Sequence, residues 1–335
     1  MPQSLPRLTG LGYFVPPNIR TNNDPIFQWL REHGGGQGLF EGFNERRVLA
    51  PGEDLMTLMP PAARSALDDA GLAASDIDLL IGMGSISEYE TPNNLSRLHQ
   101  LLGLRPSCPV VPLNREYSSF NWAVVTADAL IRVGRAHNVL IVVGTNWTRH
   151  VSYQTPQAIS AGDGAGAAVV SLSSDGSRWT LLDDLSITET RFYGSMFMRG
   201  DSVDPIPPQT GPLFTDSYFH ITKEGASETF KQFGGVTAPS AACQVLERNG
   251  LKGADAALIG HQASSLLLDA WVKAIQPAQL LSTLTTFANM VAATIPVNLA
   301  WAPASDPVIP NHLVCLALGP DAHADAILLK REPPE

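Results

Sequence analysis

Two polar residues, His261 and Asn289, follow apolar segments of the sequence, and both side chains can handle a carbonyl group. His261 closes a short apolar run in I-G-H-Q-A-S-S, and a histidine there has a pKa near the working pH, as a general base needs. It can equally be a structural histidine with a hydrogen-bonded ring. Asn289, in F-A-N-M-V-A-A, can donate to a substrate carbonyl or can cap the helix expected after it.

A third position lies in residues 110–131, where an apolar strand is expected to break sharply into a buried helix. Such a break often holds a nucleophile, because the free N–H groups and the dipole at a helix start favour an anion. The residue at this break is Tyr117, followed by Ser118 and Ser119. A tyrosine hydroxyl, with an ordinary pKa of ~10, is a poor nucleophile at neutral pH. The sequence therefore predicts the frame of an active site without its usual nucleophile.

The sequence indicates phosphate contacts less clearly than it indicates the three positions above. Residues 162–167, G-D-G-A-G-A, fit neither the G-x-x-x-x-G-K-[ST] pattern nor G-x-G-x-x-G ahead of a helix. They lead into an expected strand, so we expect close packing there and not nucleotide binding. The pairs Arg46-Arg47 and Arg149-His150 can contact phosphates, although solvated surface charge explains them equally well.

Length, composition and charge limit the class of protein. The chain has 335 residues, 44% of them hydrophobic, which suffices for a large core or two domains. It shows no apolar run of the ~18 residues that span a membrane and no apolar secretory signal at its N-terminus. Cys108, Cys243 and Cys315 are widely spaced, which indicates reduced thiols in a cytosolic protein. The net charge of −10 argues against nucleic acid as the main partner.

An internal repeat is the strongest architectural signal. In residues 66–82 an expected helix ends at Gly71 and an apolar strand follows. Residues 245–260 repeat this pattern, with the helix ending at Gly250. Two copies of one βα unit predict two similar half-domains with buried sheets.

We place the half-domains at residues 1–173 and 174–335. The second begins with an expected crossover over residues 174–215, which contains the loop D-P-I-P-P-Q-T-G-P. Proline is expected to exclude regular structure from this crossover.

Taken in order, these pieces resemble the β-ketoacyl-acyl-carrier-protein synthase III family of the thiolase fold, over nearly the whole chain. The matching motifs are G-L-x-x-x-D-I-D-L-L-I-G at 71–82, G-D-G-A-G-A at 162–167 and G-H-Q-A-S at 260–264. The resemblance implies an α/β fold with five layers, αβαβα, built from two duplicated half-domains. It also implies a homodimer and acyl chemistry on thioesters of coenzyme A or of a phosphopantetheine-bearing acyl carrier protein, with no metal and no permanently bound cofactor.

The family's catalytic set is a cysteine, a histidine and an asparagine. The resemblance places the histidine at His261 and the asparagine at Asn289, although the family's turn G-N-T-S is A-N-M-V here. The family pattern N-x-x-C-x-G-F aligns without gaps on residues 114–120, which puts Tyr117 at the cysteine position. The glycine loop near the C-terminus departs too: if Pro320 takes the place of the oxyanion donor, that N–H is lost.

Without a thiolate, cysteine-dependent condensation is not expected, yet His261 and Asn289 still suit acyl chemistry. The leading hypothesis is a non-condensing acyltransferase of specialised metabolism that moves an acyl group from a thioester to an alcohol or amine. His261 is its base, Asn289 polarises the carbonyl, and Ser118 is the fallback nucleophile. One alternative is a decarboxylative or cyclising enzyme acting on a malonyl-type thioester. Another is a catalytically silent partner of an active paralogue, with Tyr117 plugging the acyl pocket.

Overall fold

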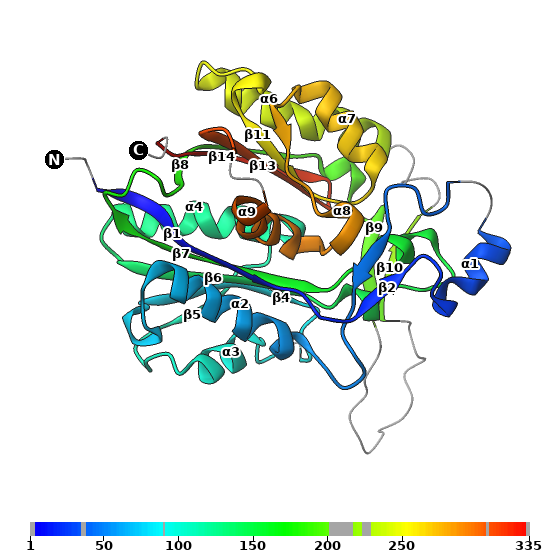
Figure 1. Ribbon diagram of the computed structural model, residues 1–335, viewed down its shortest axis with the longest axis horizontal. Coiled ribbons are helices and arrows are strands. Elements are labelled where there is room, and N and C mark those ends of the chain that lie inside the picture. The colour runs from blue at the N-terminus through cyan, green and yellow to red at the C-terminus, as the bar shows by residue number, and fades with distance from the viewer. Residues whose placement is uncertain are drawn as a thin grey trace.

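The chain folds into five stacked layers, in the order helix, sheet, helix, sheet, helix (Figure 1). The computed structural model describes residues 4–34, 38–89, 91–200, 217–222, 229–305 and 308–332. The five-layered α/β thiolase fold predicted from the sequence is therefore confirmed. No helix in these ranges is long and apolar enough to cross a membrane.

Two five-stranded sheets form the second and fourth layers. The first sheet consists of β1 (Leu5–Phe14), β7 (Gly164–Ser173), β6 (Asn138–Thr145), β4 (Leu79–Ser85) and β5 (Val110–Pro112), in that order. The second consists of β8 (Thr180–Thr188), β14 (His323–Lys330), β13 (His312–Gly319), β11 (Ala257–Gly260) and β12 (Gln279–Leu280), in that order. In each sheet, taken in the order given, the first two strand pairs are antiparallel and the last two are parallel. Strands β4 and β11 therefore run parallel to both of their neighbours.

Six longer helices form the other three layers of the described chain. The middle layer contains α4 (Ser119–Arg132) and α9 (Thr294–Ser305) (Figure 1). The outer layer on the first sheet contains α2 (Leu55–Ala70) and α3 (Leu95–Leu102). The outer layer on the second sheet contains α6 (Ala238–Arg248) and α7 (Ser265–Ile275). Apolar clusters fill the spaces between the layers, and the largest fully buried side chain is Trp271 of α7.

The two halves repeat one another, as the sequence predicts. Helices α2 and α6 are each followed by a glycine in the left-handed region, Gly71 at φ 65° and Gly250 at φ 69°. This conformation is accessible to glycine at little steric cost, which favours a helix end there: α2 ends one residue before Gly71, and α6 ends two residues before Gly250. A 3₁₀ turn and a central strand, β4 or β11, follow in each copy.

The predicted crossover is partly wrong. Residues 174–215 include β8, which forms the edge of the second sheet and pairs antiparallel with β14. The prolines that suggested irregular structure begin only at Pro205, and they lie outside the described residues. A second strand of this region, β9 (Met196–Gly200), pairs with β10 (Ser217–Ile221).

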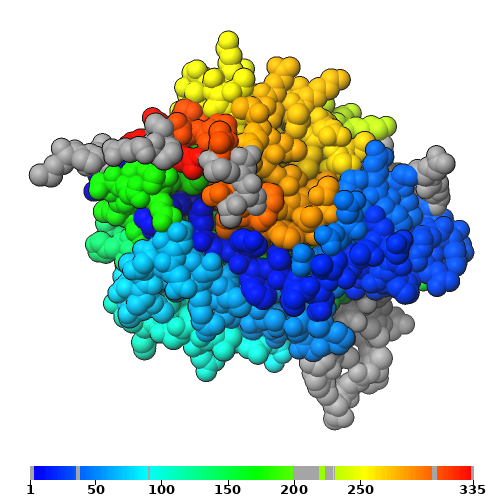
Figure 2. All heavy atoms as spheres, in the orientation of Figure 1, coloured from blue at the N-terminus to red at the C-terminus, as the bar shows by residue number. Residues whose placement is uncertain are grey.

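An N-terminal segment joins the two halves at one end of the molecule. It contains β2 (Ile19–Thr21), α1 (Gln28–His33) and β3 (Glu45–Arg47), and Figure 2 shows it in blue against both halves. The backbone N–H of Asn44 donates to the carbonyl of Thr285, a residue of the short helix α8 (Leu284–Phe287) in the second half. The remaining short elements are 3₁₀ helices at Pro25–Phe27, Ala74–Asp76, Glu116–Ser118, Trp147–Arg149, Pro156–Ser160, Thr190–Phe192, Gly253–Asp255 and Val291–Ala293, and a π-helix at Thr229–Thr237.

Candidate active site

The fold brings Tyr117, His261 and Asn289 to one cavity of about 600 Å³. Tyr117 lies in the 3₁₀ turn before α4, His261 follows β11, and Asn289 lies between α8 and the 3₁₀ turn at Val291–Ala293. Apolar side chains make up much of the remaining wall, among them Leu39, Phe43, Trp147, Ile159, Phe219, Phe233, Leu267 and Leu318. The cavity is therefore suited to a ligand with an apolar arm and one reactive polar group.

The His261 ring is 2% exposed, and burial lowers its pKa to about 4. A hydrogen bond with the Val291 backbone raises this pKa, and the charge that His323 carries when protonated lowers it further, but burial is the largest cause. The His261 backbone is fixed by an N–H that donates to the Leu316 carbonyl at 2.9 Å. The pKa is therefore below the working pH that the sequence led us to expect: the imidazole is neutral at pH 7 and can accept a proton, but as a weaker base.

Gln262 connects the His261 loop to the turn that carries Asn289. Its Nε2 donates to the Ala288 carbonyl at 2.7 Å, and its Oε1 accepts from the Thr283 backbone N–H at 2.9 Å and from Asn298 Nδ2 at 3.1 Å. The side chain is fully buried, so these bonds replace all of its contacts with water. Sequence reasoning missed this role, although the residue stands in the same G-H-Q-A-S motif.

The side chain of Asn289 combines the two functions that the sequence left open. Its Oδ1 accepts from the Val291 backbone N–H at 2.8 Å, which caps the following 3₁₀ turn. Its Nδ2 has no hydrogen-bond partner among the described residues, and the residue lines the cavity. The amide nitrogen can therefore donate to a ligand carbonyl while the oxygen stays engaged.

The G-D-G-A-G-A motif holds the Asn289 turn by close packing, as expected. A Cβ on Gly162 would lie 2.2 Å from the Phe287 carbonyl oxygen, and the Gly162 N–H donates to the Asn289 carbonyl at 3.0 Å. The fully buried Asp163 accepts from the Leu49 N–H at 2.9 Å and from the Thr148 N–H at 3.0 Å. The motif thus fastens neighbouring segments to the site.

Tyr117 lies flat against His261. The two rings are 5.0 Å apart between centroids and inclined by 10°. Burial, with a smaller contribution from the charge of Glu116, raises the pKa of the Tyr117 hydroxyl far above its usual value. A hydroxyl that stays protonated is a donor or a space-filling group and a poor nucleophile.

A second cavity of about 680 Å³ lies on another side of Tyr117. Four residues line both cavities: Tyr117, Trp147, Met196 and Phe219. Pro320 lines only the larger cavity, whereas Gly319 lines the cavity of His261 and Asn289. The loss of an oxyanion donor was expected only if Pro320 takes the donor's place, and it stays a prediction.

The predicted phosphate contacts lie away from both cavities. The Arg47 guanidinium packs over the Phe287 ring at 5.6 Å, and Arg149 donates to the Ala50 carbonyl at 2.7 Å. Neither arginine lines one of the two cavities. Their role toward a phosphate stays a prediction.

None of the three cysteines replaces the missing nucleophile. All three lie in the described part of the chain and line neither cavity. Burial raises the pKa of each thiol, most strongly at Cys315, so the reactive thiolate is disfavoured.

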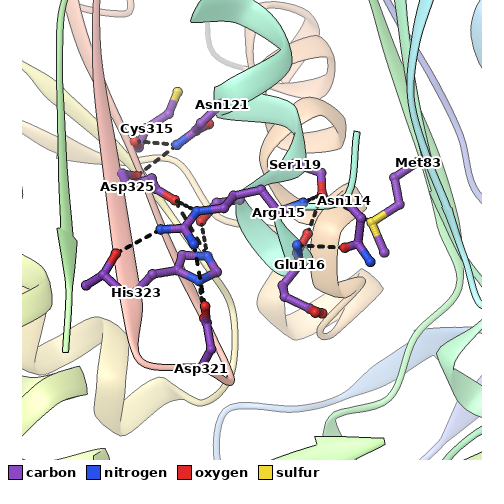
Figure 3. Close-up of polar contacts among 12 residues, drawn as sticks. Met83, Asn114, Arg115, Glu116, Ser119, Asn121, Cys315, Asp321, His323 and Asp325 are labelled. Carbon is purple, nitrogen blue, oxygen red and sulfur yellow. Dashed lines mark hydrogen bonds and ion pairs between the residues drawn. The ribbon is translucent and has the colours of Figure 1, made fainter. Parts of the chain in front are cut away.

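Ser118, the fallback nucleophile, is fully buried and lines neither cavity. Its hydroxyl lies 2.9 Å from Nε2 of His323, a residue that the sequence analysis did not single out. Figure 3 shows His323 with Asp321, Asp325 and Arg115 around it.

Comparison with known proteins gives the family. The family model for 3-oxoacyl-[acyl-carrier-protein] synthase III matches residues 113–185. The β-ketoacyl-[acyl-carrier-protein] synthase III of Sphingopyxis alaskensis is 30% identical over 87% of this chain and 88% of its own length, and that of Rhodospirillum rubrum is 28% identical over 92% and 94%. This chain belongs to the β-ketoacyl-acyl-carrier-protein synthase III family.

Solved structures show the same fold. The synthase III from Aquifex aeolicus superposes with a TM-score of 0.82 at 23% identity and covers 97% of this chain and 99% of its own. The priming β-ketosynthase from the R1128 polyketide biosynthetic pathway superposes with a TM-score of 0.84 at 22% identity and covers 99% and 98%.

Proposed function

We propose that this protein is a non-condensing acyltransferase of specialised metabolism, which moves an acyl group from a thioester to an alcohol or amine. The observation that carries the proposal is the position of Tyr117. A protonated tyrosine ring lies against His261 at the family's cysteine position, while His261 and Asn289 still share an apolar cavity. The chain lacks a thiolate to hold the acyl group for condensation but keeps the groups that act on a carbonyl.

The chemistry of this transfer uses groups with suitable protonation. Asn289 Nδ2 donates to the thioester carbonyl and stabilises the negative charge that develops on its oxygen. Neutral His261 accepts the proton of the attacking hydroxyl or amine. The new C–O or C–N bond forms, the C–S bond breaks, and the proton passes from His261 to the departing thiol. The two cavities on either side of Tyr117 provide separate space for two reactants.

The donor, the partners and the location are inferences from the family relationship. We infer a coenzyme A or acyl-carrier-protein thioester as donor, a cytoplasmic protein and a homodimer. The edge strand β5 supports the dimer, because its Val111 is 41% exposed at the end of the first sheet. The likeness to a priming β-ketosynthase of a polyketide pathway supports a role in specialised metabolism.

The test is release of free thiol from acetyl, malonyl, octanoyl and benzoyl thioesters of coenzyme A and of acyl carrier protein, with small alcohols and amines present. We expect release and an acylated acceptor in wild type, and a rate lower by ~10²–10⁴-fold in His261→Ala. His137→Ala, which changes a side chain that is 78% exposed, is the matched control. Absence of thiol release from every donor would refute the proposal.

The Tyr117 ring also supports a second candidate, a catalytically silent subunit. Because Tyr117 lies at the boundary of the two cavities, its ring can close the path between them. A silent subunit predicts no thiol release from the isolated protein, but a stable heterodimer when it is co-expressed with an active synthase of the same family. Size-exclusion chromatography with mass determination distinguishes that heterodimer from a homodimer.

A further inference from the structure

A serine, a histidine and an aspartate are joined in series by hydrogen bonds beside the candidate active site. Ser118 Oγ lies 2.9 Å from His323 Nε2, and Nδ1 of the same imidazole is hydrogen-bonded to Asp321 Oδ1. The serine and the histidine are fully buried, whereas the Asp321 side chain is 35% exposed. This order of groups is that of a nucleophilic triad, in which the aspartate orients the imidazole and the imidazole deprotonates the serine.

The local structure leaves the Ser118 hydroxyl available to His323. Ser118 occupies the N-cap position of α4, where a serine side chain commonly bonds a free backbone N–H of the first turn. Here the side chain makes no such capping bond. The neighbouring Ser119, in contrast, uses its hydroxyl within the turn, where it bonds the Glu116 carbonyl at 2.7 Å. The Ser118 hydroxyl is therefore directed to the imidazole instead of to the helix.

The aspartate of this hydrogen-bonded series, Asp321, is held by an ion pair with Arg115. Arg115 reaches Asp321 at 3.4 Å and a second carboxylate, that of the buried Asp325, at 3.3 Å (Figure 3). Asp325 Oδ2 in turn lies 3.6 Å from His323 Nε2. These contacts fix the turn between β13 and β14 against the start of α4.

The protonation state of His323 suits a base. Burial lowers its pKa, and the nearby carboxylates of Asp325 and Asp321 offset only part of this effect. The imidazole is then neutral near pH 7. Because Asp321 is an acceptor, it holds the proton on Nδ1 and leaves the Nε2 lone pair facing Ser118.

We propose that Ser118, with His323 as its base and Asp321 as the orienting carboxylate, is the nucleophile that carries the acyl group as a serine ester. This inference rests on the proposed acyltransferase function and replaces direct transfer by two steps. In the first, Ser118 Oγ bonds to the thioester carbonyl carbon, its proton passes to His323 Nε2, and the C–S bond breaks as the thiol leaves with that proton. In the second, an alcohol or amine attacks the ester carbonyl carbon and forms the new C–O or C–N bond, and its proton passes to His323. The bond from the carbonyl carbon to Ser118 Oγ then breaks, and the serine hydroxyl re-forms with that proton.

Two residues that line the cavities, Gly319 and Tyr117, lie next to the Ser118–His323 pair. Gly319 lines the smaller cavity, and a Cβ on it would lie 2.0 Å from Cε1 of His323, so the imidazole packs directly on the glycine backbone. The preceding residue, Tyr117, lines both cavities. We expect the Tyr117 ring to limit the approach of an acyl group to the serine, because Tyr117 is its neighbour in the chain and lines both cavities. Removal of that ring is therefore expected to expose the nucleophile.

The experiment is intact-protein mass spectrometry of the full chain after incubation with acetyl-, malonyl-, octanoyl- and benzoyl-coenzyme A, each without an acceptor. We expect one acyl adduct per chain, located at Ser118 by peptide fragmentation. Ser118→Ala and His323→Gln are expected to slow its formation by ~10³-fold or more. Ser119→Ala, which removes an equally buried hydroxyl from the same turn, is the matched control and is expected to keep the adduct.

Tyr117→Ala keeps the proposal falsifiable if adduct formation in wild type is slow. With the ring removed, the adduct is expected to form at least tenfold faster, and thermal unfolding confirms that each variant is folded. No adduct in wild type or in folded Tyr117→Ala, or an adduct elsewhere, overturns the inference. If thiol release to an acceptor persists without an adduct, the acyltransferase function stands and transfer is direct. If thiol release is absent as well, the proposed function fails.

Discussion

The neutral, buried state of His261 predicts a specific dependence of stability on pH. A histidine in an unfolded chain titrates near ~6.5, whereas burial lowers the pKa of His261 to about 4 in the folded protein. Between these values the unfolded chain binds more protons than the folded one. The free energy of unfolding therefore falls as the pH is lowered through this window, and this contribution is constant above it.

The size of the effect follows from the two pKa values. For His261 alone, the free energy of unfolding decreases by about 2 kcal/mol between pH 7 and pH 4.5, with a limit of ~3 kcal/mol at lower pH. The side chain is 2% exposed, so solvent screening does not reduce this figure appreciably. His323 contributes with the same sign, because burial lowers its pKa too. The share of His261 is isolated by comparison with a variant that lacks only this imidazole.

The assay is urea unfolding, followed by tryptophan fluorescence, of wild type and His261→Gln at pH 7 and pH 4.5. The variant can be less stable at both values, but it is expected to lose about 2 kcal/mol less than wild type on acidification. His137→Gln, with a side chain 78% exposed in wild type, is expected to behave as wild type does. An equal loss in wild type and His261→Gln would refute the reasoning that His261 is neutral and buried.

Three further predictions concern the groups around the site. Asn289→Ala removes the free Nδ2 donor and should lower the rate of thiol release by ~10²–10³-fold; a rate within twofold of wild type contradicts that role. Gly162→Ala places a Cβ 2.2 Å from the Phe287 carbonyl oxygen and should reduce the free energy of unfolding by ~1–3 kcal/mol, with an unchanged urea midpoint as the contrary result. Asp163→Ala leaves the buried Thr148 N–H without its acceptor, which should cost ~1–3 kcal/mol or more, whereas wild-type stability would show that the aspartate is dispensable.

Much of the architecture was predictable because its signals are contiguous in the chain. The repeat of a helix, a left-handed glycine and an apolar strand depends on local conformation and on periodic burial, so it predicted the duplicated sheets. The G-D-G-A-G-A motif likewise predicted close packing, since small residues follow one another where backbones approach. Strand β8 was missed because the proline-rich part of its region, after Pro205, dominated the interpretation of residues that precede it.

The candidate site likewise has features that the sequence predicted and features that only the structure shows. From the sequence we predicted that His261 and Asn289 belong to the site and, through the resemblance to the family, that Tyr117 stands at the position of its cysteine. Only the tertiary structure decided that the tyrosine ring stacks on His261 and that the Asn289 amide oxygen accepts a hydrogen bond while its nitrogen faces the cavity. It also decided that Arg47 and Arg149 line neither cavity.

The structure also decided the partner of Ser118. This serine meets a histidine 205 residues further along the chain, because the turn between β13 and β14 packs against the start of α4. Such a contact depends on strand register and on the stacking of the middle helices between two sheets. These are properties of long-range packing, and no local pattern around Ser118 or His323 specifies them.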